Sequence, residues 1–116
     1  MSKIKFKHTF LGTHSYSKCP FDEVGFLRNE HHHDFTIHVE CSVIHDDRDL
    51  EWIMLRVELM EMVESSFEVN HKIVRFAERS CEMIAEEVKK YFVGKYGDRH
   101  WKVSVSEDET YIGGDW

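Results

Sequence analysis

Three histidines lie where the apolar faces of two predicted strands end, and their positions favour a metal site. His31 and His33 continue the apolar alternation of residues 35–43, so both imidazoles are expected on the core side of that strand. His14 continues the alternation of the N-terminal stretch in the same way. If the two strands pair as a hairpin, the three imidazoles meet. Such a set binds zinc and leaves a position open for substrate, whereas partly exposed histidines at a strand end need no metal.

The other histidines nearby do not share this arrangement. His32 has the opposite parity and is expected to face away from the pair. His8 has the right parity but lies in the middle of the first strand, which suits a core or supporting role. His38 and His45 lie too far along the second strand to reach the cluster. The prediction is therefore restricted to three ligands.

Two further residue types could take part in chemistry. Cys19 precedes Pro20 in the segment between the two strands, and it is either part of a structural turn or a reactive thiol. Glu107 ends the apolar alternation of a late strand, as the histidines end theirs. A carboxylate there can accept two parallel hydrogen bonds from a ligand, or it is an exposed member of the acidic run 107–109.

Changes of hydrophobic period predict the elements that position these residues. The expected order is strand, strand, helix, helix, strand, strand, with a packed loop over 15–29 between the first two strands. The first helix is expected over about 50–65, and the second begins after the N-cap Ser80 and ends at 94–97. Residues 67–79 have no clear period and suggest a loop or broken turn. The late strands are expected over 101–107 and 110–116.

Length and composition set the outer limits. A chain of 116 residues suits one domain, 1–116. Its net charge of −7 argues against nucleic-acid or membrane-surface partners, which require a positive field. The sequence has no signal-peptide pattern and no long apolar span. Its 3 scattered cysteines fit a reducing compartment better than a disulfide framework, so we expect a cytoplasmic protein.

Four motifs, in order along the chain, resemble those of one known family. They are 10–14 (FLGTH), 31–35 (HHHDF), 80–85 (SCEMIA) and 103–107 (VSVSE). The first two resemble the zinc-ligand motifs of the 6-pyruvoyltetrahydropterin synthase and 6-carboxytetrahydropterin synthase family, which has the tunnelling fold. The third resembles the start of that family's second helix, and the fourth resembles the strand that ends in its pterin-anchoring glutamate.

The resemblance implies an α+β tunnelling fold, with a four-stranded antiparallel sheet (ββααββ), two helices on one face and a barrel-forming homo-oligomer, a hexamer in the family. It also implies Zn²⁺ at His14, His31 and His33, and a small-molecule pterin substrate bound by Glu107 and Glu82. The implied activity is that of a carbon–oxygen lyase acting on 7,8-dihydroneopterin triphosphate. The product would be a 6-carboxy- or 6-pyruvoyl-tetrahydropterin, on the route to queuosine and other 7-deazapurines or to biopterin.

Two departures from the family concern the proton-transfer groups. Residues 25–27 occupy the region of the family's catalytic cysteine, so Cys19 would have to replace it. The family's Asp-His pair has no clean match, and Asn70-His71 is the nearest sequence. Cys19 and His71 are therefore the catalytic candidates. The alternative is a non-catalytic, metal-containing relative that binds a purine-like or pterin-like ligand or a protein partner.

Overall fold

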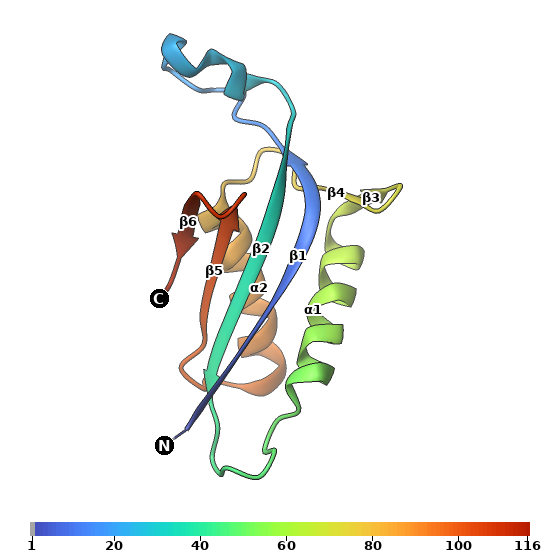
Figure 1. The fold of residues 1–116 in the computed structure, drawn as a ribbon, viewed down its shortest axis with the longest axis vertical. Coiled ribbons are helices and arrows are strands. Elements are labelled where there is room, and N and C mark those ends of the chain that lie inside the picture. The colour runs from blue at the N-terminus through green and yellow to red at the C-terminus, as the bar shows by residue number, and fades with distance from the viewer. Residues whose placement is uncertain (1) are drawn as a thin grey trace.

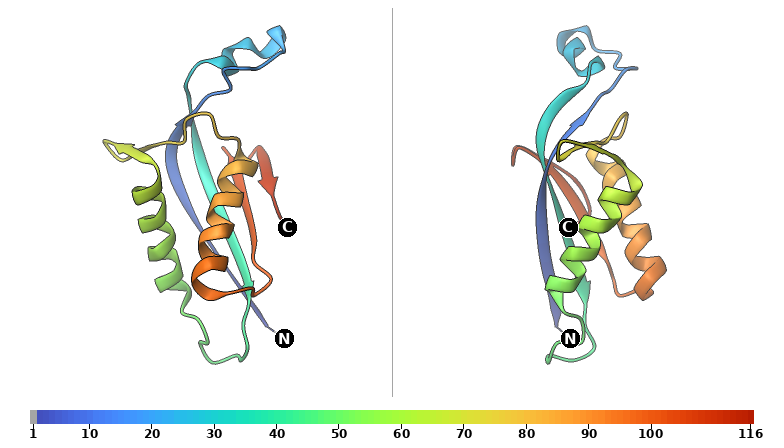
Figure 2. Two further views of the ribbon diagram at one scale, coloured as in Figure 1. Left: turned by 180° about the vertical axis from the view of Figure 1, so that it is seen from behind. Right: turned by 90° about the vertical axis from the view of Figure 1, so that its right-hand side faces the viewer.

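The computed structural model describes residues 2–116 and consists of one sheet with two long helices on one of its faces (Figure 1). In chain order the elements are β1 (Lys3–His14), the 3₁₀ helix η1 (Asp22–Arg28), β2 (His31–Ser42), α1 (Trp52–Ser66), β3 (Glu68–Asn70), β4 (Ile73–Arg75), α2 (Cys81–Tyr96), β5 (Lys102–Glu107) and β6 (Tyr111–Gly114). The view from behind shows α1 and α2 side by side across the sheet (Figure 2). The α+β class is therefore confirmed.

The prediction of a four-stranded antiparallel sheet is wrong. The sheet has six strands in the order β3-β4-β1-β2-β5-β6, and β4 runs parallel to β1 while the other neighbours are antiparallel. The two additional strands, β3 and β4, lie within residues 67–79, where the sequence shows no clear hydrophobic period. Each of them is three residues long. Such short strands offer too few residues for an alternating pattern to be recognised.

Side-chain caps account for the start of both helices, and a glycine accounts for the end of α2. The Ser80 side chain accepts a hydrogen bond from the backbone N–H of Met83 and caps α2. Gly97 follows the last turn with a φ of 78°, a conformation that glycine adopts without strain. The Glu51 side chain caps α1 by accepting from the N–H of Ile53. Both helix starts lie within two residues of the predicted positions.

The core lies between the apolar face of the sheet and the two helices. Strand residues with odd numbers in β2 and β5 meet the buried faces of α1 and α2, and the fully buried members include Ile37, Val39, Val103, Val105, Leu59, Val63, Ile84 and Val88. Each such side chain contributes at most about 1.5–3 kcal/mol of hydrophobic free energy. This packing fixes the faces of β1 and β2, and with them the direction in which the terminal histidines point.

Gly12 lies where β1 packs tightly against the segment that follows β4. A Cβ at this position would lie 2.8 Å from the Phe76 ring and 2.9 Å from the Phe35 ring. The absence of a side chain therefore lets two aromatic rings close over the strand, two residues before His14. Among the described helices, none combines the length and the apolar character that a membrane span requires.

Candidate metal centre and adjoining cavity

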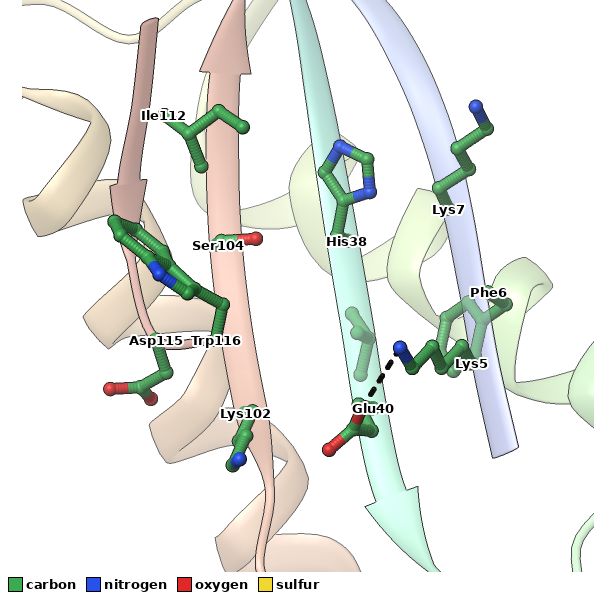
Figure 3. A pocket seen from close by; sticks show the side chains of 11 residues that line it. Lys5, Phe6, Lys7, His38, Glu40, Lys102, Ser104, Ile112, Asp115 and Trp116 are labelled. Carbon is green, nitrogen blue, oxygen red and sulfur yellow. Dashed lines mark ion pairs between the residues drawn. The ribbon is translucent and has the colours of Figure 1, made fainter. Parts of the chain in front are cut away.

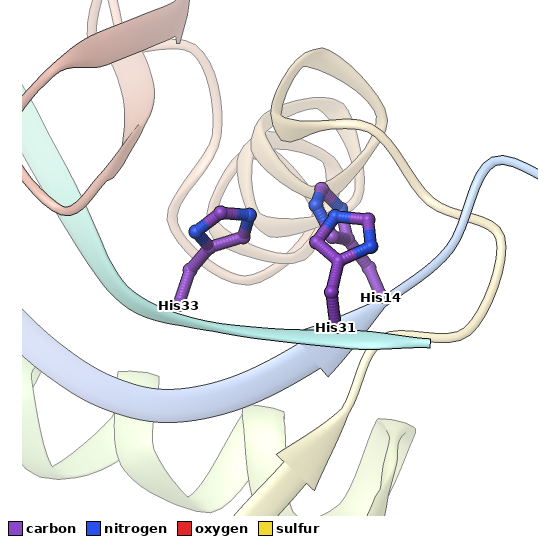
Figure 4. Close-up of side chains that lie close together, drawn as sticks. All are labelled: His14, His31 and His33. Carbon is purple, nitrogen blue, oxygen red and sulfur yellow. The ribbon is translucent and has the colours of Figure 1, made fainter. Parts of the chain in front are cut away.

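The pairing of β1 with β2 brings the three predicted histidines together. His14 lies opposite His31, and His33 lies opposite Gly12. The ring centroids are 4.6 Å apart for His14 and His31, 5.3 Å for His14 and His33, and 4.9 Å for His31 and His33. One ring nitrogen from each residue lies within 4.8 Å of the others (Figure 4). We call these three residues the histidine cluster.

The Nδ1 atoms of the cluster make its hydrogen bonds to the surrounding acceptors. Each Nδ1 atom faces an acceptor outside the cluster, namely the Arg79 carbonyl for His14 at 2.8 Å, the Asn29 carbonyl for His31 at 2.8 Å, and Asp108 Oδ2 for His33 at 2.6 Å. An imidazole that donates from Nδ1 presents the Nε2 lone pair to a metal. Nε2 of His31 is buried and has no partner among the described residues. These nitrogens fit a metal ion.

Asp108 supports the cluster from the turn after β5. Its other oxygen, Oδ1, accepts a hydrogen bond of 2.7 Å from the backbone N–H of Asp34. That N–H, followed by the bond from His33, lowers the pKa of Asp108. The aspartate is therefore held ionised against His33, an arrangement that orients metal-binding imidazoles and raises their basicity.

Glu107, the last residue of β5, lies directly beside the cluster. Its Oε1 atom is 3.1 Å from Nε2 of His14, and its Oε2 atom is 3.5 Å from Nε2 of His33. The hydrogen bond with His14 lowers the pKa of Glu107 even though burial opposes this. Burial lowers the pKa of His14, but the bonds to Glu107 and to the Arg79 carbonyl outweigh it and raise that pKa. The carboxylate of Glu107 thus lies in front of the Nε2 atoms of His14 and His33.

A cavity of about 760 Å³ opens next to the histidine cluster, and we call it the site cavity. This volume is in the range of small-molecule binding sites. Its walls come from the start of α2, the segment before it, the loop after β1, and the ends of β2, β5 and β6. The lining residues are His14, Ser15, Tyr16, Lys18, Leu27, His31, Glu78, Arg79, Ser80, Cys81, Glu82, Met83, Glu107 and Tyr111.

Cys81 is a site residue that the sequence reasoning missed. Its thiol is 3.3 Å from Glu107 Oε1, and the residue is only 1% exposed. Burial and the neighbouring Glu107 raise the pKa of the Cys81 thiol, so the thiol stays protonated and donates a hydrogen bond to the carboxylate instead of acting as a nucleophile. Its position one turn before the buried Ile84 and Ala85 was the available signal, because it places the thiol on the inner face of α2.

The predicted residues Glu107 and Glu82 both line the site cavity, whereas Cys19 and His71 do not. Cys19 is 4% exposed, and its thiol donates to the Phe21 carbonyl at 3.7 Å. His71 is exposed in the turn between β3 and β4, where its φ is 52°. The two catalytic candidates therefore do not contribute to the wall of the site cavity.

A second cavity, of about 490 Å³, lies on the sheet face that the helices leave open (Figure 3). Its polar side chains include Lys5, Lys7, His38, Glu40 and Lys102, and Lys5 pairs with Glu40 at 3.4 Å. None of these residues belongs to a group of convergent metal-ligating side chains among the described residues. The site cavity is therefore the better candidate for chemistry.

Comparison with known proteins gives matches in structure only. No family model matches the sequence, and no curated protein matches it. A structure of 6-pyruvoyl tetrahydropterin synthase from Plasmodium falciparum superposes with a TM-score of 0.60 at 13% identity, covering 96% of this chain and 94% of that one. A structure of the Plasmodium vivax enzyme gives a TM-score of 0.54 at 12% identity, covering 97% and 96%.

Another Plasmodium vivax structure, described as a catalytic residue mutant in which a glutamate is replaced by cysteine, gives a TM-score of 0.57 at 12% identity. It covers 96% of this chain and 94% of that one. Matches over nearly the whole chain at such low identity establish the fold. The resemblance predicted from the four sequence motifs is thus confirmed as a structural match to 6-pyruvoyltetrahydropterin synthases.

Proposed function

We propose that this chain is a zinc-dependent, pterin synthase-like lyase that acts on 7,8-dihydroneopterin triphosphate. Its product would be a 6-carboxy- or 6-pyruvoyl-tetrahydropterin, on a route to queuosine or biopterin. The observation that carries the proposal is the convergence of one ring nitrogen from each of three imidazoles beside Glu107, at the wall of a cavity of about 760 Å³. The match in fold to 6-pyruvoyltetrahydropterin synthases supports the same class of substrate.

His14, His31 and His33 would hold the metal through Nε2, with Nδ1 fixed by the partners described above. A bound zinc ion acts as a Lewis acid and lowers the pKa of a coordinated hydroxyl group. The protein's own contribution is to orient the imidazoles and to give the cluster an adjoining cavity. Metal coordination through Nε2 would also replace the contacts that the Glu107 carboxylate makes with Nε2 of His14 and of His33.

Glu107 would then recognise the ring of the substrate. Its carboxylate can accept parallel hydrogen bonds from a ring N–H and an exocyclic amine, which are the donors of a pterin. Cys81 donates to one of its oxygens and holds the side chain at the cavity wall. Glu82 lines the same cavity and supplies a second acceptor.

The proton-transfer groups are proposed from the resemblance and from the lining of the site cavity. Cys19 and His71 remain the candidates by resemblance, and each would have to move to reach the cavity. In the Plasmodium vivax enzyme the catalytic residue is a glutamate, and the site cavity here contains three, Glu78, Glu82 and Glu107. A carboxylate base is therefore compatible with this site.

The assembly and the compartment follow from the same resemblance and from the thiols. We propose a homo-oligomer, a hexamer in the family, that acts in the cytoplasm. All three cysteines are buried and unpaired, which suits a reducing compartment.

The alternative function is that of a non-catalytic, metal-containing protein that binds a pterin-like or purine-like ligand or a protein partner. The separation of Cys19 and His71 from the cavity favours this alternative.

The deciding experiment is incubation of the zinc-loaded protein with 7,8-dihydroneopterin triphosphate, followed by measurement of released triphosphate. Release that disappears in His33→Ala and in Glu107→Gln supports the lyase. Parallel assays of Cys19→Ser and His71→Ala test the two catalytic candidates, and rates unchanged in both would exclude them. Tight pterin binding without any release would instead support the non-catalytic alternative.

A further inference from the structure

Tyr111, the first residue of β6, contacts another side chain that lines the site cavity. Its hydroxyl donates a hydrogen bond to Oε1 of Glu82, in the first turn of α2. Both side chains line the cavity, although they lie 29 residues apart in the chain. The terminal strand thus reaches one of the two carboxylates that were assigned to ligand recognition.

Gly113, two residues further along β6, makes room for the same carboxylate. A Cβ built at this buried position would overlap Oε1 of Glu82 and would lie 2.9 Å from its Cδ. The φ of Gly113 is not in the left-handed region, so the need for glycine here is one of space. Gly113 pairs with Val105 of β5, which fixes the strand at this distance from α2. One residue of β6 therefore donates to Glu82 and another leaves space for it.

The contact with Tyr111 occupies one of the two oxygens of the Glu82 carboxylate. With Oε1 satisfied by Tyr111, Oε2 is the oxygen that remains available to a ligand. A free glutamate on the first turn of a helix would otherwise sample several rotamers, and ordering it on binding would cost conformational entropy. A side chain that is already held in place binds its ligand more tightly for the same contact.

We propose that Tyr111 is a positioning residue that holds Glu82 so that its free oxygen accepts an N–H from the 2-amino edge of a bound pterin. This inference deepens the proposed function and rests on it for the identity of the ligand. Glu82 then acts as a second acceptor alongside Glu107. The expected specificity is for rings that carry an exocyclic amine over rings that carry a carbonyl at the same place.

The binding test uses the zinc-loaded protein with pterin and with lumazine, which has a carbonyl in place of the 2-amino group. Tyr111→Phe should weaken pterin binding roughly tenfold, the value of one well-placed hydrogen bond, and should change lumazine binding much less. Gly113→Ala should have the same effect by displacing Glu82. Ile112→Ala, on the same strand but facing the second cavity, is the matched control and should leave both affinities unchanged.

The double variant decides whether Tyr111 acts through Glu82. In a Glu82→Ala background, Tyr111→Phe should cause no further loss of pterin affinity. An undiminished effect of Tyr111→Phe in that background, or equal losses for pterin and lumazine in the single variant, would overturn the proposal.

A second readout requires no ligand. The hydrogen bond to Glu82, followed by burial, raises the pKa of Tyr111 to about 12. At about pH 10 a free tyrosine is half ionised. At this pH, the difference between the ultraviolet absorption spectra of wild type and Tyr111→Phe should show no band of an ionised phenol. The corresponding difference in the Glu82→Ala background should show it. An ionised Tyr111 in the wild type would overturn the contact itself, whereas a protonated Tyr111 without pterin binding would count against the proposed ligand alone.

Discussion

At the scale of single residues, the histidine cluster depends on acceptors that hold its Nδ1 atoms. Two of these acceptors are backbone carbonyls, and the third is the Asp108 side chain. Only Asp108 can be altered without moving the backbone. Its φ of 49° lies in the left-handed region, which asparagine tolerates better than most residues, so Asp108→Asn is a mild change of conformation.

Asp108→Asn should lower zinc affinity roughly 10–100-fold, because the amide cannot raise the basicity of His33 as the carboxylate does. Competition with a chromogenic chelator measures this affinity. Glu109→Gln, at the next and exposed position, removes the same charge without touching the cluster and should leave the affinity unchanged. Equal zinc affinities of Asp108→Asn and wild type would show that Asp108 does not support the metal site.

At the scale of elements, the alternation of β1 and β2 was sufficient to predict which histidines meet. The side-chain period of a strand is two, so the apolar faces that pack on α1 and α2 also fix the direction of His14, His31 and His33. Helix α2 was equally readable from its cap and buried stripe. The hairpin of β3 and β4 was not, because its strands are only three residues long.

The remaining site residues could not be found from sequence for a different reason. Asp108 appeared only as part of an acidic run, and Tyr111 only as part of a short terminal strand. Their contacts with His33 and Glu82 depend on the turn after β5 and on the distance between β6 and α2. Such distances follow from packing of the whole chain, which no local period encodes.

Because β1 packs tightly against the segment after β4, alanine at Gly12 and alanine at Gly94 should change the stability in opposite directions. Gly12→Ala should lower the free energy of unfolding by about 1–3 kcal/mol, because its methyl group would press on the Phe35 and Phe76 rings. Gly94→Ala in α2 meets nothing within 4 Å and should raise it by roughly 0.5–1 kcal/mol. Urea unfolding of both variants measures the difference, and a neutral Gly12→Ala would contradict the packing at this point.

His38 of β2 predicts a pH dependence of stability. Burial, followed by the charge of Lys7, lowers its pKa below the ordinary value of 6.5. The unfolded chain therefore takes up the proton more readily than the folded one. The contribution of His38 to stability is fully present above pH 6.5 and is lost as the pH falls through the lower, folded value. His38→Gln should flatten the decline of unfolding free energy across this range, and an unchanged decline would contradict the shift.

At the scale of the whole molecule, the chain is elongated. Its principal extents are 51 × 28 × 23 Å and its radius of gyration is 15.2 Å, whereas a compact chain of this length would have a radius of about 13 Å. The loop and η1 after β1 project beyond the sheet (Figures 1 and 2). This arm carries Phe21 and Phe26, which are 59% and 66% exposed. An exposed apolar arm is a feature of a subunit that packs against copies of itself.

We therefore predict a sedimentation mass several times that of the chain at micromolar concentration. Phe26→Ser should shift the distribution toward smaller species, because it removes exposed apolar surface from the arm. Glu23→Ser, at an exposed polar position of the same arm, should not. A wild-type protein that sediments only as a monomer would contradict the oligomer and the burial of the arm.

The measurement that tests the account most directly is a calorimetric titration of the metal-free protein with Zn²⁺. The wild type should bind one ion per chain, and His14→Ala, His31→Ala and His33→Ala should each lose nearly all of this binding. His32→Ala should retain it, because its side chain is exposed and points away from the cluster. Binding that survives His31→Ala but disappears in His32→Ala would show that the pairing of the two strands differs by one residue and that His14, His31 and His33 do not form a metal site.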